Sequence, residues 1–116
     1  MKRVFIYLVL IVLLSSVFRL YQLGKTPNAL EWDEVALGYD AYSILKTGRD
    51  QFGKFMPVTF RSLDDYKPPI YEYATVPSVA IFGLTPFAVR LPSALSGIGM
   101  VFVLFFFSKL IFCCKR

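Results

Sequence analysis

The sequence has no histidine, and its 116 residues include only two cysteines, Cys113 and Cys114. Without histidine the chain can form neither a histidine general base nor a zinc site of the usual histidine-containing kind. Neighbouring cysteines rarely form a disulfide with each other, and the sequence has no other cysteine to pair with them. We therefore interpret both as free thiols, with lipidation at a membrane edge as an alternative.

Acidic residues are missing from both ends of the chain, because all eight lie between Glu31 and Glu72. The whole chain has a net charge of +5, whereas segment 24–90 has seven basic and eight acidic residues and is therefore slightly negative. A nucleic-acid-binding domain would gather its positive charge on one basic, aromatic surface. Here the positive charge lies at the ends of apolar segments, where it indicates orientation in a membrane.

The composition indicates a membrane protein, because 56% of the residues are apolar and the mean hydropathy is +0.56. An ordinary soluble domain has about 45–50% apolar residues. As a helix, residues 4–23 would reach about 30 Å, the hydrocarbon thickness of a bilayer. A cleaved signal peptide is the alternative, although no good cleavage site follows. We predict an all-α membrane protein in which two transmembrane helices, 4–23 and 91–113, flank an extracytoplasmic loop, residues 24–90.

A third apolar segment, residues 68–83, would change this topology if it crossed the membrane. As a helix it would reach only about 24 Å, and it contains Glu72 and Pro77. Three crossings would also place the basic pairs 2–3 and 115–116 on opposite sides, against the positive-inside tendency. We therefore predict a multi-pass plasma-membrane protein with two crossings and both termini in the cytoplasm. Segment 68–83 would be a helix along the outer membrane face.

The segment that follows the first apolar run has helical periodicity. Between residues 32 and 46, Val35, Tyr39 and Tyr42 recur at helical spacing, whereas Asp33 and Asp40 stand on another face. Aromatic side chains below and carboxylates above would suit a helix that lies in the membrane interface. We predict such a helix over residues 32–46.

Two adjacent acids, Asp33 and Glu34, follow Trp32 close to the predicted membrane exit. Carboxylates beside a bilayer are costly to keep there without a purpose, so we take Asp33 and Glu34 as candidate catalytic residues. The alternative for Asp33 is an N-cap, because aspartate caps helices well and its charge suits the helix dipole. Capping alone does not explain why Trp32 and Glu34 stand beside it.

A second candidate site is Lys67, which lies between Tyr66 and two prolines at the start of the predicted helix 68–83. A cation beside unpaired backbone N–H groups at the membrane face could bind a lipid phosphate, and Tyr66 belongs to the same candidate site. The alternative is a lysine that only snorkels to the interface.

The acids Asp64 and Asp65 lie close by. We interpret them as a solvated surface network with Arg61 and Lys67. A metal site of carboxylates is a weaker alternative, because no ligand-loop motif accompanies them.

Several short motifs follow one another along the chain, and their order is more specific than any single motif. They are Asp33-Glu34, Gly38-Tyr39-Asp40-Ala41-Tyr42, Thr47-Gly48, Tyr66-Lys67-Pro68-Pro69-Ile70-Tyr71, Phe82-Gly83 and Arg90-Leu91-Pro92-Ser93-Ala94-Leu95. Over roughly residues 15–112 this order resembles the first outer loop of the C-type (GT-C) membrane glycosyltransferases. The resemblance is greatest to glycosyltransferase family 39, the protein O-mannosyltransferase and aminoarabinose transferase family (dolichyl-phosphate-mannose–protein mannosyltransferases).

The resemblance implies transfer of a sugar from a polyprenyl-phosphate donor to a protein, lipid or glycan acceptor on the outer face. It implies that Asp33 is the base or a key carboxylate of the site, and that Lys67 lines the donor phosphate site. It also implies that two helices of the loop lie along the membrane. No cofactor is expected, since the lipid-linked sugar is a substrate, and a divalent metal stays open.

Members of that family have many more membrane helices and a second acidic loop. We therefore expect this chain to be the N-terminal part of such an enzyme and to be inactive alone. Its expected partners are a polyprenyl-phosphate sugar, membrane lipids and the remaining part of the enzyme, without nucleic acid. The alternative is a small two-helix membrane protein whose outer loop binds a partner or a lipid phosphate without catalysis.

Overall fold

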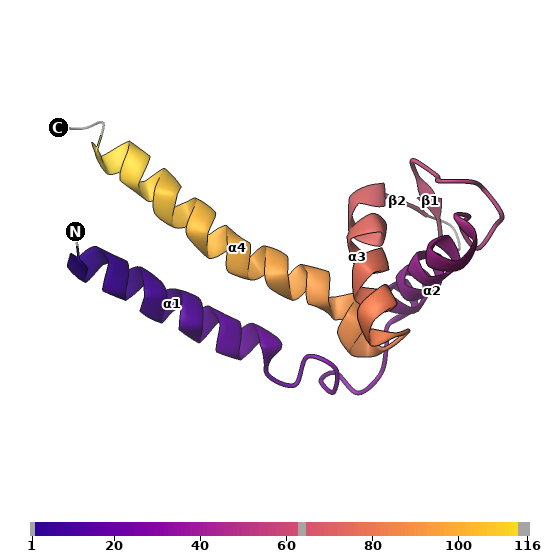
Figure 1. Cartoon of the computed structure of the whole chain (residues 1–116), viewed down its shortest axis with the longest axis horizontal. Helices are drawn as coiled ribbons and strands as arrows, with labels where there is room; N and C mark the ends of the chain where they lie inside the picture. The colour runs from indigo at the N-terminus through magenta and orange to yellow at the C-terminus, as the bar shows by residue number, and fades with distance from the viewer. Residues whose placement is uncertain (1, 63–64, 114–116) are drawn as a thin grey trace. The chain divides into compact units, whose positions relative to one another are not determined.

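The computed structural model describes residues 2–62 and 65–113, with side chains for 4–62 and 65–112. These residues form mostly helix, which confirms the all-α fold class. The elements are α1 (Lys2–Leu20), α2 (Trp32–Thr47), β1 (Phe60–Arg61), β2 (Tyr66–Lys67), α3 (Pro69–Phe82) and α4 (Pro86–Cys113) (Figure 1). The side chains of Asp64, Cys113 and Cys114 lie outside the described part, so their predicted roles stay predictions.

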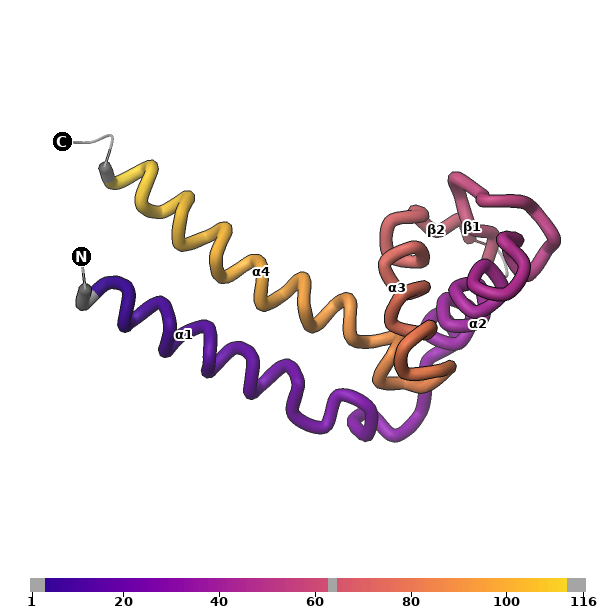
Figure 2. The backbone as a smooth tube through the Cα atoms, in the orientation of Figure 1, coloured from indigo at the N-terminus to yellow at the C-terminus, as the bar shows by residue number. Residues whose placement is uncertain are grey.

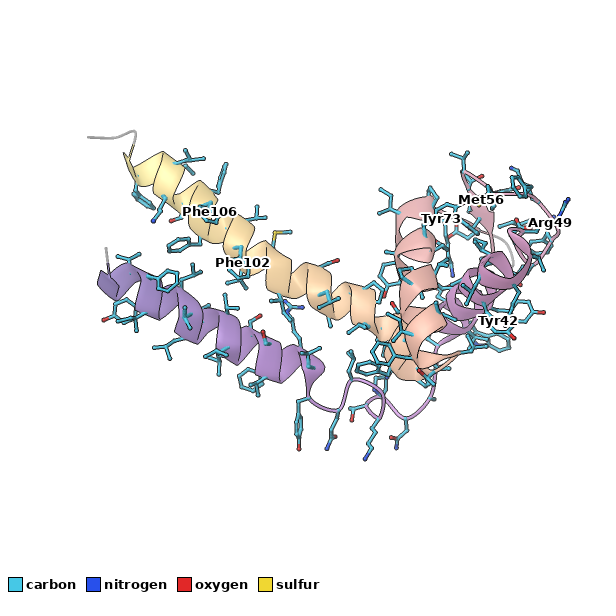
Figure 3. All side chains as sticks on the ribbon, viewed as in Figure 1. Tyr42, Arg49, Met56, Tyr73, Phe102 and Phe106 are labelled. Atoms are coloured by element: carbon cyan, nitrogen blue, oxygen red, sulfur yellow. The ribbon has the colours of Figure 1, made fainter. Side chains whose placement is uncertain are left out.

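The chain divides into two compact units, residues 1–21 with 93–116, and residues 22–92. Figure 2 traces the backbone from one to the other. The first unit consists of α1 and most of α4. Large apolar side chains on both helices are exposed, for example Phe5 on α1, at 65%, and Phe102 and Phe106 on α4, at 40% and 58% (Figure 3). Exposed apolar surface of this extent marks a part of a protein that contacts lipid or another protein.

One helix in the described part of the chain, α4 over Pro86–Phe112, is long and apolar enough to cross a membrane by length and composition. The apolar part of α1, Val4–Leu20, is shorter. The structure therefore gives one candidate span, and the predicted second crossing stays a prediction. Within this unit the Arg19 guanidinium lies against Gly97, where an added Cβ would clash with it.

The helix predicted over 91–113 begins five residues earlier, at Pro86. The hydroxyl of Thr85 accepts a hydrogen bond from the Ala88 N–H at 3.2 Å, and Pro86 suits the first helical position. Our sequence-based start was wrong because it placed the boundary at the charge of Arg90. The first helix likewise ends at Leu20 and not at residue 23.

In the second unit, α2 packs against α3. The buried core comprises Ala41 of α2, Val79 of α3 and Ala88 of the first turn of α4. Gly38 allows α2 to lie close to the first turn of α4. A Cβ at Gly38 would lie 2.9 Å from a methyl group of Val89, which is shorter than real contacts allow. The helices α2 and α3 match the predicted segments 32–46 and 68–83 to within one residue at each end.

The two faces of α2 differ from the prediction in one respect. Val35 and Tyr39 are exposed, as an interfacial helix requires, but Asp40 is only 3% exposed. It is buried because Gln51 donates to both of its carboxylate oxygens, from the backbone N–H at 2.9 Å and from the side-chain amide at 3.2 Å. The predicted water-facing position of Asp40 was therefore wrong, since periodicity alone does not reveal a partner eleven residues away.

The loop after α2 begins at Gly48, whose φ of 69° ends the helix as its N–H bonds to the Ile44 carbonyl at 2.8 Å. Further along, β1 and β2 pair in antiparallel register, with Phe60 opposite Lys67 and Arg61 opposite Tyr66. Each of these strands is only two residues long. Because successive side chains alternate across a strand, Phe60 and Lys67 share one face of this ladder, and Arg61 and Tyr66 share the other.

Candidate functional site

The first turn of α2 holds the acids that the sequence singled out. Glu31 takes the N-cap position, and it forms a capping box with Glu34, whose carboxylate accepts the Glu31 N–H at 3.4 Å. The N-cap alternative for Asp33 is therefore wrong, because Asp33 is the second residue of α2 and lies two positions after the N-cap. Asp33 and Glu34 still meet the positive end of the helix dipole.

The structure brings Asp33 and Lys67 together. The Lys67 Nζ lies 2.8 Å from Oδ1 of Asp33 and donates to the Asp33 backbone oxygen at 3.3 Å. The lysine side chain is 15% exposed, whereas that of Asp33 is 74% exposed. The lysine stem is thus covered by protein, while the carboxylate stays open to a reactant. The pair can accept a proton at Asp33 and hold an anion at Lys67.

Glu34 faces a different cation. Arg90 donates two hydrogen bonds of 2.8 Å to it, from Nε to Oε1 and from Nη2 to Oε2. The same guanidinium also donates to backbone oxygens 3.2–3.4 Å away, those of Leu23, Pro27 and Ala29. The Arg90 hydrogen bonds hold the pKa of the Glu34 carboxyl below its usual range. With both oxygens bound to Arg90, Glu34 positions the first turn of α2 and is poorly placed to accept a proton.

Arg90 is the residue that sequence reasoning missed most clearly. It is only 7% exposed, and it ties the chain before α2 to the second turn of α4. In the sequence it appears as the charge that flanks an apolar run, and 56 positions separate it from Glu34. The one available signal was its place in the last of the ordered motifs.

Tyr66 does not join the Asp33–Lys67 pair. It lies on the opposite face of the ladder from Lys67, is 69% exposed, and lines a separate cleft with Arg61. The expected network around Asp65 is also absent from the described residues. Its carboxylate accepts the Tyr66 N–H at 2.7 Å, and Arg61 lies over the Phe52 ring.

Two buried acids, Glu72 and Asp40, interact electrostatically with Lys67. Glu72 of α3 is 1% exposed, and its Oε2 has no hydrogen-bond partner among the described residues. Burial raises the pKa of Glu72 and of Asp40, and the charge of Lys67 opposes this rise in both. The sequence had marked Glu72 only as an interruption of an apolar segment. No group of three or more potential metal ligands occurs within the described residues.

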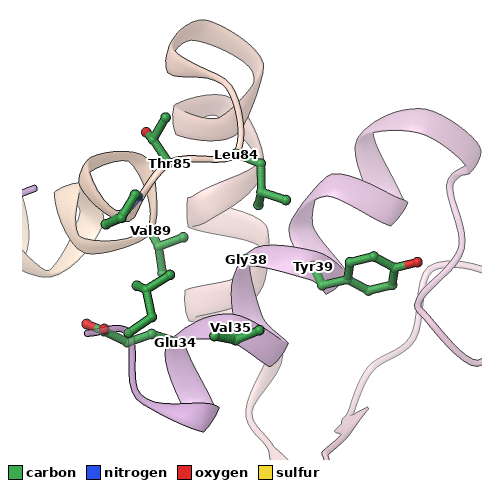
Figure 4. Close-up of a pocket in the computed structure, with 9 residues that line it drawn as sticks. Glu34, Val35, Gly38, Tyr39, Leu84, Thr85 and Val89 are labelled. Carbon is green, nitrogen blue, oxygen red and sulfur yellow. The ribbon is translucent and has the colours of Figure 1, made fainter. Parts of the chain in front are cut away.

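A small apolar pocket lies beside Glu34, with a volume of about 120 Å³. Figure 4 shows its walls: Val35, Gly38 and Tyr39 come from α2, and Leu84, Thr85 and Val89 come from the turn before α4 and its first turn. Pockets for drug-sized ligands measure about 300–1,000 Å³, so this one suits only a short apolar group.

Comparisons with known proteins give no match: no family model, no curated protein and no solved structure matches the chain. The ordered motifs and the geometry of the second unit are therefore the observations that bear on function.

Proposed function

We propose that this chain contributes the donor-binding carboxylate and lysine of a membrane glycosyltransferase that resembles the GT-C enzymes of family 39. The observation that carries the proposal is the ion pair between Asp33 and Lys67, two residues that the motifs select independently. A proton acceptor beside an anion-binding cation is what transfer from a polyprenyl-phosphate sugar requires.

In the proposed reaction, an acceptor hydroxyl oxygen attacks the anomeric carbon of the donor sugar. The bond from that carbon to the lipid phosphate oxygen breaks, and the configuration at the carbon inverts. Asp33 takes the hydroxyl proton, and the departing phosphate keeps the electron pair of the broken bond. Lys67 opposes the negative charge on the phosphate, since its ammonium has three donors and can bind the phosphate while it holds Asp33.

The surface of the second unit supports a place at the outer membrane face. Val35 and Tyr39 on α2 are exposed, and so are Ile70 and Ile81 on α3, at 81% and 75%. Such side chains suit helices that lie in the interface between lipid and water. We propose that α1 and α4 both cross the membrane, that both termini are cytoplasmic, and that loop 24–90 lies outside.

The resemblance also leads us to propose that further membrane segments complete the donor pocket and the acceptor site, so that this chain alone does not turn over. A second candidate function is lipid-phosphate binding without catalysis. One observation favours it: Asp33 is 74% exposed and ion-paired, whereas a catalytic base usually lies in a site with less water.

A chimaera separates the two functions. Residues 2–113 would replace the first two membrane helices and the loop between them in a family 39 enzyme. The proposal expects transfer from a polyprenyl-phosphate sugar, lost at least a hundredfold in Asp33→Asn because general-base catalysis contributes about 10²–10⁴-fold. Asp65→Asn is the matched control and should keep full activity. Donor binding without transfer, or transfer that survives Asp33→Asn, would overturn the catalytic role and favour the second function.

A further inference from the structure

The face of the β1–β2 ladder that bears Arg61 and Tyr66 forms the wall of a cleft of about 210 Å³. The remaining lining residues are Asp50, Phe52, Lys54 and Thr59. Alternation along the strands places this cleft and Lys67 on opposite faces of the ladder. The cleft is therefore distinct from the Asp33–Lys67 pair, and nothing in the proposed donor site accounts for it.

The cleft is lined by two positively charged side chains, Lys54 and Arg61, and by one negatively charged side chain, Asp50. Asp50 is 5% exposed, and its Oδ1 is already bound by the backbone N–H groups of Phe52 and Lys54, at 3.0 and 2.7 Å. Its negative charge is thus satisfied by the backbone of its own turn. Neither Lys54 nor Arg61 forms an ion pair with any carboxylate in the part of the chain that the structure describes.

The guanidinium of Arg61 is held in place without losing its donors. It lies over the Phe52 ring, with 5.5 Å between the guanidinium carbon and the ring centroid. A cation–π contact of this kind restrains the guanidinium, whose N–H groups are suited to bind a carboxylate or phosphate in bidentate fashion. Lys54 adds a second, more mobile cation to the same cleft.

The other walls offer apolar and hydroxyl surface together. The Tyr66 and Phe52 rings are 69% and 57% exposed, and Thr59 contributes a hydroxyl group. Exposed aromatic rings give an apolar platform, while the tyrosine and threonine hydroxyls can donate or accept hydrogen bonds. The volume is below that of pockets for drug-sized ligands, so it matches one small ring with a charged substituent.

We propose that this cleft binds a monosaccharide unit that carries a single anionic group, either a carboxylate or a phosphate. Arg61 and Lys54 bind the anion, and the Tyr66 ring stacks on the apolar face of the sugar. The preference for a sugar rests on the proposed glycosyl transfer, whereas the preference for an anion follows from Lys54 and Arg61, two cations that form no ion pair with another described residue. The site is separate from the donor phosphate site at Lys67.

Isothermal titration and saturation-transfer NMR on the whole protein in lipid nanodiscs test the proposal. The probes are glucuronic acid, glucose 6-phosphate, neutral glucose and inorganic phosphate. We expect at least one anionic sugar to bind at least tenfold more tightly than both glucose and phosphate. Equal affinity for glucose would overturn the anion contacts. Equal affinity for phosphate in Lys67→Ala, which lacks the proposed donor phosphate site, would overturn the sugar contacts. Absence of binding by both anionic sugars would overturn the site.

Variants locate the binding. Arg61→Gln and Tyr66→Leu should each weaken it at least tenfold, and Lys54→Gln, which lies outside the ladder, should weaken it to a smaller extent. If Arg61→Gln or Tyr66→Leu disturbs folding in circular dichroism, Lys54→Gln alone decides, and unchanged affinity in that variant would overturn the proposal. Lys67→Ala should leave the affinity unchanged, because the donor site is on the other face. Equal loss in Lys67→Ala would mean that the two sites are one.

These measurements are independent of the proposed function. Loss of donor binding or transfer in the Asp33 and Lys67 variants concerns the pair, whereas loss of anionic-sugar binding in the Arg61, Lys54 and Tyr66 variants concerns the cleft. Either can fail while the other succeeds.

Discussion

The ammonium of Lys67 lies 2.8 Å from the carboxylate of Asp33, although 34 positions separate the two residues. The lysine reaches this position because β2 pairs with β1 and places it on the same face as the buried Phe60. An ion pair with an exposed partner contributes only about 0–1 kcal/mol to stability. Its contribution to the free energy of folding is therefore small.

Asp33→Asn is expected to change the free energy of unfolding by less than about 1 kcal/mol, because the carboxylate is mostly exposed and the helix keeps its Glu31 cap. Chemical denaturation of the protein in detergent, followed by circular dichroism, measures this. A loss of several kcal/mol would show that Asp33 is a structural residue and would weaken its assignment to chemistry.

Arg90→Ala is expected to be far more damaging, at about 3–5 kcal/mol, because it leaves Glu34 and three backbone oxygens without their donor. Arg61→Ala, which removes an exposed arginine, is the control and should cost less than about 1 kcal/mol. The same denaturation experiment compares the two. Equal effects of both variants would contradict the central role of Arg90 in positioning α2.

Much of the second unit follows from local sequence signals. Gly48 and Gly83 end α2 and α3 at positive φ values of 69° and 71°, and Pro69 is the first residue of α3. These signals are short-range, because a glycine or a proline fixes the backbone at its own position.

The contacts between the site residues could not be predicted from the sequence. Glu34 and Arg90 are 56 positions apart, and no local pattern links them. Lys67 and Tyr66 are neighbours that we assigned to one site, yet a strand of only two residues places them on opposite faces. Such a strand is too short to show the alternation that would have predicted this.

The pH dependence of stability should contain two opposite contributions. The pKa of Glu34 is lowered by Arg90, so its stabilising contribution is present above the ordinary glutamate pKa of about 4.3 and is lost as the pH falls through the lower folded value. Glu34→Gln should therefore reduce stability at pH 7 and abolish this part of the loss in acid. Unfolding free energies measured between pH 3 and pH 7 test it, and an unchanged acid profile in the variant would contradict it.

The contribution of Glu72 to the pH dependence of stability has the opposite sign. Burial raises its pKa, so its favourable contribution is full below about pH 4.3 and is lost as the pH rises through the folded value. Glu72→Gln should therefore stabilise the protein at pH 7 and flatten this part of the profile. Asp40→Asn is the matched control, because burial also raises the pKa of Asp40, whose oxygens Gln51 binds. A Glu72→Gln variant that is less stable at pH 7 would show that the charged carboxylate has a partner of its own.

The most direct test of the account is donor binding by Lys67. The whole protein in nanodiscs is titrated with a short-chain polyprenyl phosphate and with the polyprenol of the same chain length. We expect the phosphate to bind more tightly than the alcohol, and Lys67→Ala to weaken phosphate binding about tenfold or more, since a charged hydrogen bond contributes about 1.5–3 kcal/mol. Lys46→Ala, an exposed lysine on α2, should leave the affinity unchanged. Equal binding of alcohol and phosphate, or an unchanged affinity in Lys67→Ala, would contradict the claim that this pair forms the donor site.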